Sequence, residues 1–95
     1  MTDRITRIRE ALVTTFSPLE CKLEDESALH IGHAGAASGA GHFRLTIVSA
    51  LFEGQNRVER HRLVYDCLRD LMRTEIHALN IEALTPAEAA AKKTG

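Results

Sequence analysis

Hydrophobic side chains in the first segment of the chain, residues 3–16, recur at helical steps of three and four. They are Ile5, Ile8, Leu12 and Phe16. This spacing puts them on one face and predicts an amphipathic helix, for which Thr2 or Asp3 can serve as the N-cap. Ser17 and Pro18 then end the helix, because a proline disfavours helical geometry in the residue before it.

Two later segments alternate between hydrophobic and polar positions and predict two strands. The hydrophobic positions of the first strand are Leu19, Cys21 and Leu23. In the second, residues 42–52, hydrophobic positions alternate with Arg44 and Thr46, and Val48 falls on the polar side. These hydrophobic positions are Phe43, Leu45 and Ile47. The two strands are long enough to pair as a hairpin.

No periodicity is present between these strands, from Asp25 to Gly41, and this connection is rich in glycine. Its glycines are Gly32, Gly35, Gly39 and Gly41. Connections of this length in small domains tend to be functional or disordered. We therefore expect a long surface loop, which carries His30 and His33.

Helical spacing returns after Gly54-Gln55-Asn56, a turn in which Asn56 can cap the main helix. Its recurring positions are Val58, His61, Val64, Tyr65, Leu68, Leu71 and Met72. We expect this helix to end near residues 73–75. On its apolar side, His61 is predicted to pack among hydrophobic neighbours, and Tyr65 to lie in the core with its hydroxyl at the surface.

Residues 76–84, "IHALNIEAL", alternate again and predict a third strand. One face is expected to carry His77, Leu79, Ile81 and Ala83. In "TPAEAAAKK", Thr85 stands at an N-cap, Pro86 at the first helical position and Glu88 three residues after the cap. This capping-box pattern predicts a short helix that frays after its alanines.

The order helix, strand, strand, helix, strand, helix predicts an α+β fold. Strands two and three, joined through a helix, can lie in one sheet with a right-handed crossover. The expected architecture is a three-stranded mixed sheet with helices packed on one face. We expect a single domain over residues 1–95, with its core in about 3–84 and a short helix and frayed tail in 85–95.

Composition and charge narrow the functional classes. A formal net charge of -1 argues against a protein that coats nucleic acid, so any such role must come from a local patch. Arg57, Arg60 and Arg62 at the start of the main helix are the candidate patch, although acidic residues interleaved with them are typical of a solvated helix face. No nucleophile–base pair, paired-carboxylate site or phosphate loop stands at usable spacing, so an enzyme is not expected.

The cysteines and the N-terminus indicate the compartment. Cys21 and Cys67 are far apart and match neither a disulfide framework nor a zinc motif, which favours a reducing, cytoplasmic environment. No apolar run approaches the roughly 20 residues of a membrane helix, and charges stand where a signal peptide needs an apolar stretch. We expect no membrane association.

The stretches "DESALHIGHAGAASGAGHF", "RHRLVY" and "IHAL", at their spacing here, resemble the BolA family. The resemblance covers the chain from about Leu19 to Glu88. It implies a class II KH-like fold, which agrees with the predicted element order. BolA relatives are also described as transcriptional regulators and linked to stress responses. A KH domain, however, grips nucleic acid with a GxxG loop between helices, whereas the glycines here lie between strands.

The resemblance also implies a partner and a cofactor. The partner is a monothiol glutaredoxin of the CGFS type, with which the protein shares a [2Fe-2S] cluster in iron–sulfur trafficking or iron and redox regulation. Glutathione and the glutaredoxin supply thiolates, and the BolA-like chain supplies a third-strand histidine, here His77, and a loop ligand. The loop ligand is His30, with His33 as the alternative. His42 and His61 match family motifs as weaker candidates.

Imidazole is a suitable ligand for iron, and histidine in place of thiolate raises the potential of a [2Fe-2S] cluster. Two histidines cannot supply the four ligands of such a cluster, so no cluster is expected in the isolated protein, which is expected to be a monomer or weak homodimer. Without the resemblance, the residues favour a hydrogen-bonded strand residue at His77 and a residue pointing to solvent at His42, at the start of strand two; the resemblance reverses this for His77. The alternative function is a DNA-binding transcriptional regulator.

Overall fold

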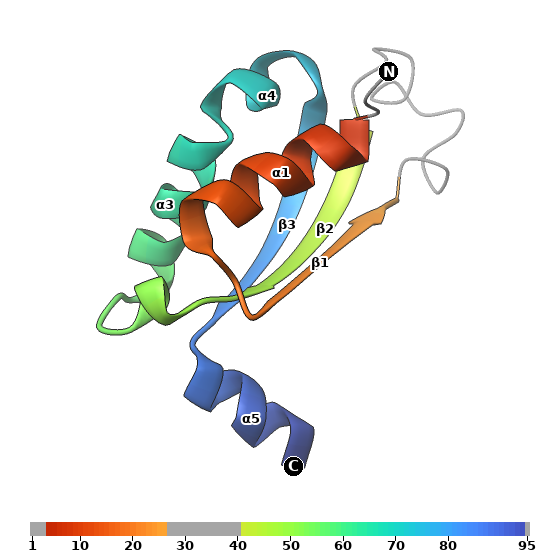
Figure 1. Ribbon diagram of the computed structural model, residues 1–95. Helices are drawn as coiled ribbons and strands as arrows, with labels where there is room; N and C mark the ends of the chain where they lie inside the picture. The colour runs from red at the N-terminus through yellow and green to blue at the C-terminus, as the bar shows by residue number, and fades with distance from the viewer. Residues whose placement is uncertain (1–3, 27–40, 95) are drawn as a thin grey trace.

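The computed structural model describes residues 4–26 and 41–94, where helices and strands follow in the predicted order (Figure 1). The elements are α1 (Arg4–Phe16), β1 (Glu20–Asp25), β2 (Gly41–Val48), the short 3-10 helix η2 (Ala50–Phe52), α3 (Arg57–Cys67), α4 (Arg69–Thr74), β3 (Ile76–Leu84) and α5 (Pro86–Thr94). None of the helices in these two ranges is both long and apolar enough to span a bilayer.

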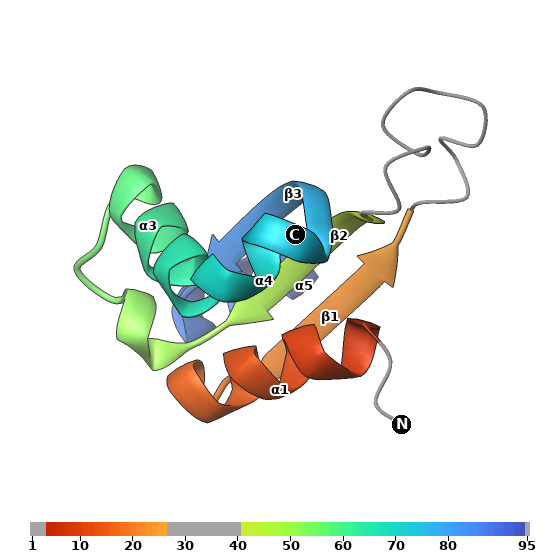
Figure 2. The same ribbon diagram turned by 90° about the horizontal axis from the view of Figure 1, so that it is seen from above.

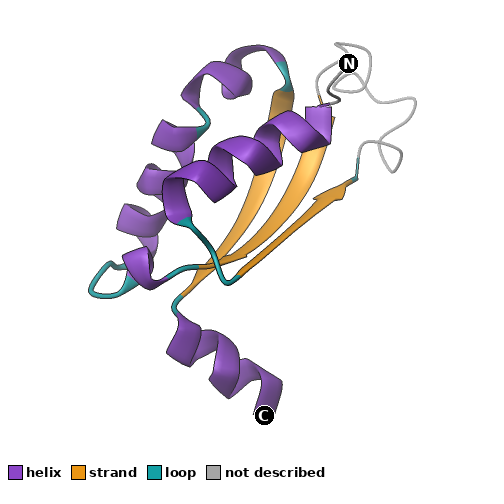
Figure 3. Cartoon of the chain, viewed as in Figure 1, coloured by secondary structure: helices purple, strands orange, loops and turns teal. Residues whose placement is uncertain are grey.

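The strands form a sheet in the order β1-β2-β3. β1 and β2 are antiparallel, with Leu23 opposite Leu45, and β2 and β3 are parallel, with Leu45 opposite Ile81. Helices α3 and α4 supply the crossover that a parallel pair requires. The predicted three-stranded mixed sheet is confirmed (Figure 3).

Helices α1, α3 and α4 all pack on one face of the sheet, as the two perpendicular views show (Figures 1 and 2). The core lies between them and the sheet. Its buried side chains are Ile8, Leu12, Phe16, Leu23, Phe43, Leu45, Ile47, Phe52, Val64, Leu68, Ile76 and Ile81. Side chains such as Arg44 and Asn80, on the opposite face, are exposed. The alternation along β2 therefore places His42 on the face that α1, α3 and α4 leave uncovered.

Local sequence sets the ends of the helices as expected. α1 ends at Phe16, and Ser17 before the proline has a left-handed φ of 43°. Gly54, with φ 79°, makes the turn before α3. Asn56 caps α3 in a full capping box: its side chain accepts from the Glu59 N–H at 2.9 Å, and the Glu59 carboxylate accepts from the Asn56 N–H at 2.8 Å.

The predicted single main helix is wrong in two respects. It is divided at Leu68, whose φ of -101° and ψ of 13° separate α3 from α4. Its buried side also differs, because Val58 and Tyr65 are 57% and 40% exposed while Val64 and Leu68 are buried. The surface of α3 that packs against the core runs through Val64 and Leu68, and Val58 and Tyr65 lie beside this surface. Neither is therefore a core residue.

The predicted faces of the strands also need corrections. Val48 is only 3% exposed although it was predicted on the polar side. It lies at the end of the central strand, opposite Glu20 of β1 and Leu84 of β3, so a strand flanks it on each side. His77 was predicted to share a face with Leu79, but it is exposed while Leu79 packs against the core.

Helix α5 begins with the predicted capping box, in which the Thr85 hydroxyl accepts from the Glu88 N–H at 3.1 Å and the Glu88 carboxylate accepts from the Thr85 N–H at 2.9 Å. It does not fray after its alanines but runs to Thr94. The Lys92 ammonium pairs with the Glu82 carboxylate of β3, which ties the second half of α5 to the sheet.

Candidate functional site

The structure brings two histidines together at one end of the sheet. The rings of His42, at the start of β2, and His77, at the start of β3, have centroids 5.0 Å apart and planes inclined by 44°. We call them the His42–His77 pair. His77 was predicted as a ligand, whereas His42 was expected to point to solvent and instead lies against the His77 ring.

A β-bulge creates this pair. Gly41 lies opposite Ile76, and the next residue, His42, lies opposite Ala78, so His77 has no counterpart in β2. An extra residue of this kind re-aims a side chain, and bulges are frequent beside functional sites. The bulge explains why simple alternation predicted the wrong face for His77.

The two rings differ in exposure. His77 is exposed, whereas His42 is half-buried and its Nε2 atom is buried. Within the described part of the chain, His77 is therefore the more accessible of the two imidazoles, and the His42 ring lies against it.

The chain segment with the predicted loop ligands begins and ends beside this pair. The Glu26 N–H donates to the His42 carbonyl at 2.7 Å, and the Gly41 N–H donates to the Glu75 carbonyl at 3.0 Å. His30 and His33 lie outside the described residues. Both belong to the connection between these two anchored positions.

The chemistry of the His42–His77 pair is compatible with metal binding. Imidazole binds iron and other transition metals, and His77 presents such a donor at the surface. Within residues 4–26 and 41–94, no group of three or more histidine, cysteine or acidic side chains is arranged to hold a metal ion. A four-ligand centre at this position would use ligands from outside these two ranges.

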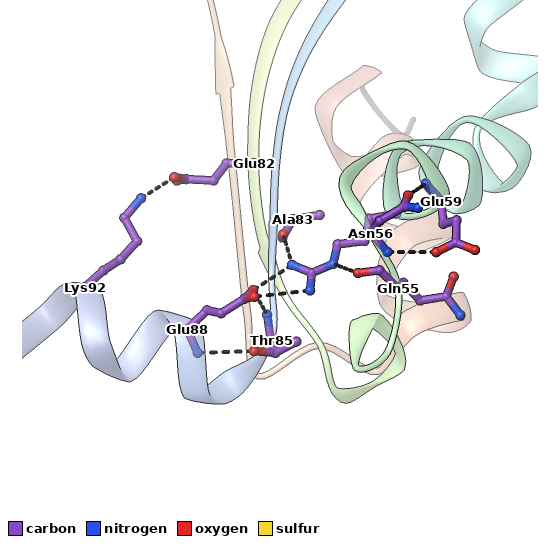
Figure 4. A network of polar contacts seen from close by, with 9 residues as sticks. Gln55, Asn56, Glu59, Glu82, Ala83, Thr85, Glu88 and Lys92 are labelled. Carbon is purple, nitrogen blue, oxygen red and sulfur yellow. Dashed lines mark hydrogen bonds and ion pairs between the residues drawn. The ribbon is translucent and has the colours of Figure 1, made fainter.

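The three arginines of the basic patch predicted at the start of α3 do not share one exposed surface in the structure. The Arg60 guanidinium donates to the carbonyls of Gln55 at 2.8 Å and Ala83 at 3.0 Å and to both Glu88 oxygens at 2.6 and 3.2 Å. Figure 4 labels these three partners, which come from the turn before α3, from β3 and from α5. Its side chain is only 14% exposed. Arg60 therefore has a structural role, and only Arg57 and Arg62 of the predicted patch are exposed.

His61 lines a cavity of about 860 Å³ between the start of α3 and the sheet, together with Arg44, Arg57, Arg60 and Asn80. It is half-buried, and its helix neighbour Val58 is exposed. The prediction that His61 packs in an apolar helix face is therefore wrong. The cavity wall belongs to α3, β2, β3 and α5 and does not include the His42–His77 pair.

The contact between Arg60 and Glu88 predicts a pH dependence for the docking of α5. Two hydrogen bonds lower the pKa of the Glu88 carboxyl from 4.5 to about 2. The one from Arg60 contributes most, and the one from the Thr85 backbone N–H is second. A carboxyl group whose pKa is lower in the folded state than in the unfolded state stabilises the fold at pH values above its unfolded pKa. This stabilisation is lost as the pH falls through the folded pKa. We expect the nuclear magnetic resonance signals of α5 to shift toward those of an undocked helix between pH 4.5 and about 2.

Glu88→Gln should remove this acid transition and leave α5 less firmly docked at neutral pH. Glu82→Gln is the matched control, because it deletes the Lys92–Glu82 contact between α5 and β3 and keeps the Arg60–Glu88 pair between α3 and α5. An acid transition that persists unchanged in Glu88→Gln would refute the assignment.

Neither cysteine has the surroundings of a reactive thiolate. Burial raises the pKa of the Cys21 thiol, with an opposing contribution from Arg9. The Cys67 thiol is hydrogen-bonded to α1, at 3.3 Å from the Ala11 carbonyl and 3.2 Å from the Thr15 hydroxyl. Both cysteines are free and half-buried.

Comparisons with known proteins agree on one family. The family model described as BolA-like protein matches residues 12–88. SufE-like protein 1, chloroplastic/mitochondrial, of Arabidopsis thaliana is 48% identical over 91 residues, which are 90% of this chain and 24% of that protein. Protein BOLA1, chloroplastic, of the same plant is 45% identical over 93 residues, 95% of this chain and 58% of that protein.

A solved structure supports the same relation. The BolA domain of SufE1 from Arabidopsis thaliana has a TM-score of 0.81 and 46% identity with this chain, and the match covers 93% of this chain and 98% of that one. The chain spans less than two thirds of the length of the two curated plant relatives.

Proposed function

The chain belongs to the BolA-like protein family, and from that membership we propose that it is a non-catalytic adaptor for iron–sulfur trafficking or iron and redox regulation. It binds a monothiol glutaredoxin of the CGFS type and shares a [2Fe-2S] cluster with that partner and glutathione. One relative that contains a BolA domain is named SufE-like, which is consistent with an iron–sulfur role.

The observation that carries the proposal is the His42–His77 pair, with its rings 5.0 Å apart. A bulge turns His77 out to an exposed position, where a partner can share its imidazole. The described residues offer two imidazoles at this point and no third metal-binding side chain. Ligands from a second protein complete such a site, which is the arrangement of an adaptor.

The second ligand from this chain comes from the connection between β1 and β2. His30 follows Glu26 by four residues, and four residues of extended chain span at most about 14 Å. β1 and β3 are separated by two strand spacings, about 10 Å, so His30 is within reach of His77. His33 is the alternative, and His42 becomes a third candidate because its ring lies against His77.

Single alanine variants of His30, His33 and His42 test this ligand set. Each is mixed with the glutaredoxin, glutathione, ferrous iron and sulfide under anaerobic conditions. We expect His30→Ala to lose most of the visible circular dichroism of the mixed complex, and His33→Ala to retain it. A loss in His42→Ala alone would assign the ligand to β2, and full spectra in all three would contradict a ligand from this chain beyond His77.

DNA binding is not proposed as a second function. Arg60, the central residue of the predicted basic patch, is held by Glu88 and two backbone carbonyls. Arg57 and Arg62 remain exposed on a helix where acidic side chains, such as Glu59 and Asp66, alternate with them. This is the composition of a solvated helix face.

A reducing, cytosol-like compartment is part of the proposal. Cys21 and Cys67 are free, which is consistent with such an environment. The names of the two plant relatives place those proteins in chloroplasts or mitochondria.

A further inference from the structure

One carboxylate, Glu75, joins α1 to the start of β3 two residues before His77. Its Oε2 atom accepts from Arg4 Nε at 3.0 Å, and its Oε1 atom lies 3.1 Å from Arg7 Nη2. The Glu75 side chain is only 21% exposed, compared with 32% for Arg4 and 45% for Arg7. Charges that are partly withdrawn from water are screened less than surface pairs, so this contact restrains the strand start.

The backbone of the same residue reaches β2. The Glu75 carbonyl accepts from the Gly41 N–H at 3.0 Å, and the Glu75 N–H donates to the Leu71 carbonyl of α4 at 2.8 Å. Gly41 immediately precedes His42. Glu75 is therefore fixed to β2 and to α4 just before the bulge. It stands two residues before His77, and its hydrogen-bond partner Gly41 stands one residue before His42.

Packing around Gly41 makes the arrangement tight. A Cβ atom at this position would lie 2.5 Å from the Phe43 ring and 2.8 Å from Arg4 Nη1. The Phe43 ring is a core side chain, 2% exposed, and cannot move freely. Only glycine lets the strand start approach Arg4 and Phe43 this closely.

We propose that Glu75 is a positioning residue that holds His42 and His77 at their observed spacing. Together with Arg4, Arg7 and Gly41 it forms what we call the Glu75 clamp. The clamp fixes the end of α4 against α1 and thereby sets where the bulge places His77. The purpose of this spacing, a ligand site shared with a partner, rests on the proposed function, whereas the clamp itself is testable in the chain alone.

The test compares Glu75→Gln with the wild type by nuclear magnetic resonance. Glutamine keeps the size of the side chain and removes its charge. We expect the cross-peak between ring protons of His42 and His77 to be lost, because it weakens steeply with distance. We also expect the glutaredoxin concentration for half-maximal cluster spectrum to rise about tenfold, a typical effect of removing an outer-shell contact.

Asp66→Asn is the matched control. It removes one carboxylate charge from the Arg69–Asp66 pair, which has a similar length of 3.1 Å but side chains that are 70% and 68% exposed. We expect its histidine cross-peak and spectrum to match those of the wild type. If Glu75→Gln fails to fold, Arg7→Gln is used in its place, because it removes one arm of the clamp and keeps the Arg4 contact.

The clamp is refuted if the cross-peak persists in the variant measured, or if it is lost equally in Asp66→Asn. Failure of the proposed function has a different signature. In that case the wild type gives no mixed-complex spectrum with the glutaredoxin, while the cross-peak still depends on Glu75.

Discussion

We expect His77→Ala to abolish the visible circular dichroism that distinguishes the mixed complex from the glutaredoxin homodimer. His77 is the exposed member of the His42–His77 pair, because the β-bulge places its side chain at the surface. The substitution therefore removes the imidazole that is more accessible to a partner. Substitutions at exposed positions usually change the free energy of unfolding by about 0.5 kcal/mol or less, and the lost ring contact with His42 adds to this only in part because His77 is exposed. The free energy of unfolding of the variant should therefore stay close to that of the wild type.

His61→Ala is the control for this result. His61 is also a partly exposed histidine, but it lies on α3 in the wall of a separate cavity. We expect its mixed complex to keep the full spectrum. Equal spectra for His77→Ala and the wild type would show that His77 is not a ligand, and an equal loss in His61→Ala would show that the effect is not specific to the site.

The second large effect is expected in the core, where Phe52→Ala should destabilise the fold by about 3–5 kcal/mol. Phe52 is fully buried, and its ring centroid lies 5.2 Å from that of Phe16, so one side chain joins η2 to α1. Single domains have a free energy of unfolding of only about 5–15 kcal/mol. Urea unfolding followed by far-ultraviolet circular dichroism measures the change as a shift in midpoint.

Leu51→Ala is the matched control for the core. Leu51 is the neighbouring residue in the same short helix and is 54% exposed. We expect its midpoint to differ little from that of the wild type. A loss of stability in Leu51→Ala as large as in Phe52→Ala would contradict the assignment of the core.

Most of the fold could be predicted from the sequence, because its determinants are local. The spacing of Ile5, Ile8, Leu12 and Phe16, at steps of three and four, favours a helix within this segment alone. The capping boxes at Asn56 and Thr85 start α3 and α5 through contacts within four residues of chain. Such features are present in the sequence before any tertiary contact forms.

Predictions failed where the structure depends on contacts between distant residues. The bulge at His77 arises from the register of β3 against β2, and no alternation within β3 contains that register. The position of Arg60 depends on Glu88, 28 residues away. The exposure of Val58 depends on which side of α3 meets the core, and a helical repeat alone does not specify this.

The candidate site was predicted only in part for the same reason. His77 was identified through its motif "IHAL", but the position of His42 beside it follows from the parallel pairing of two strands. The Glu75 clamp joins residues 71 positions apart, Arg4 and Glu75, and had no signal in the local sequence. His30 and His33 lie outside the described residues, so their predicted role remains a prediction.

The most direct measurement is visible absorption and circular dichroism of the wild-type protein mixed anaerobically with a CGFS glutaredoxin, glutathione, ferrous iron and sulfide. The proposed function predicts a spectrum distinct from that of the glutaredoxin homodimer, and co-elution of the two proteins with iron and sulfide. A spectrum identical to that of the homodimer, with no co-elution, would contradict the shared-cluster adaptor.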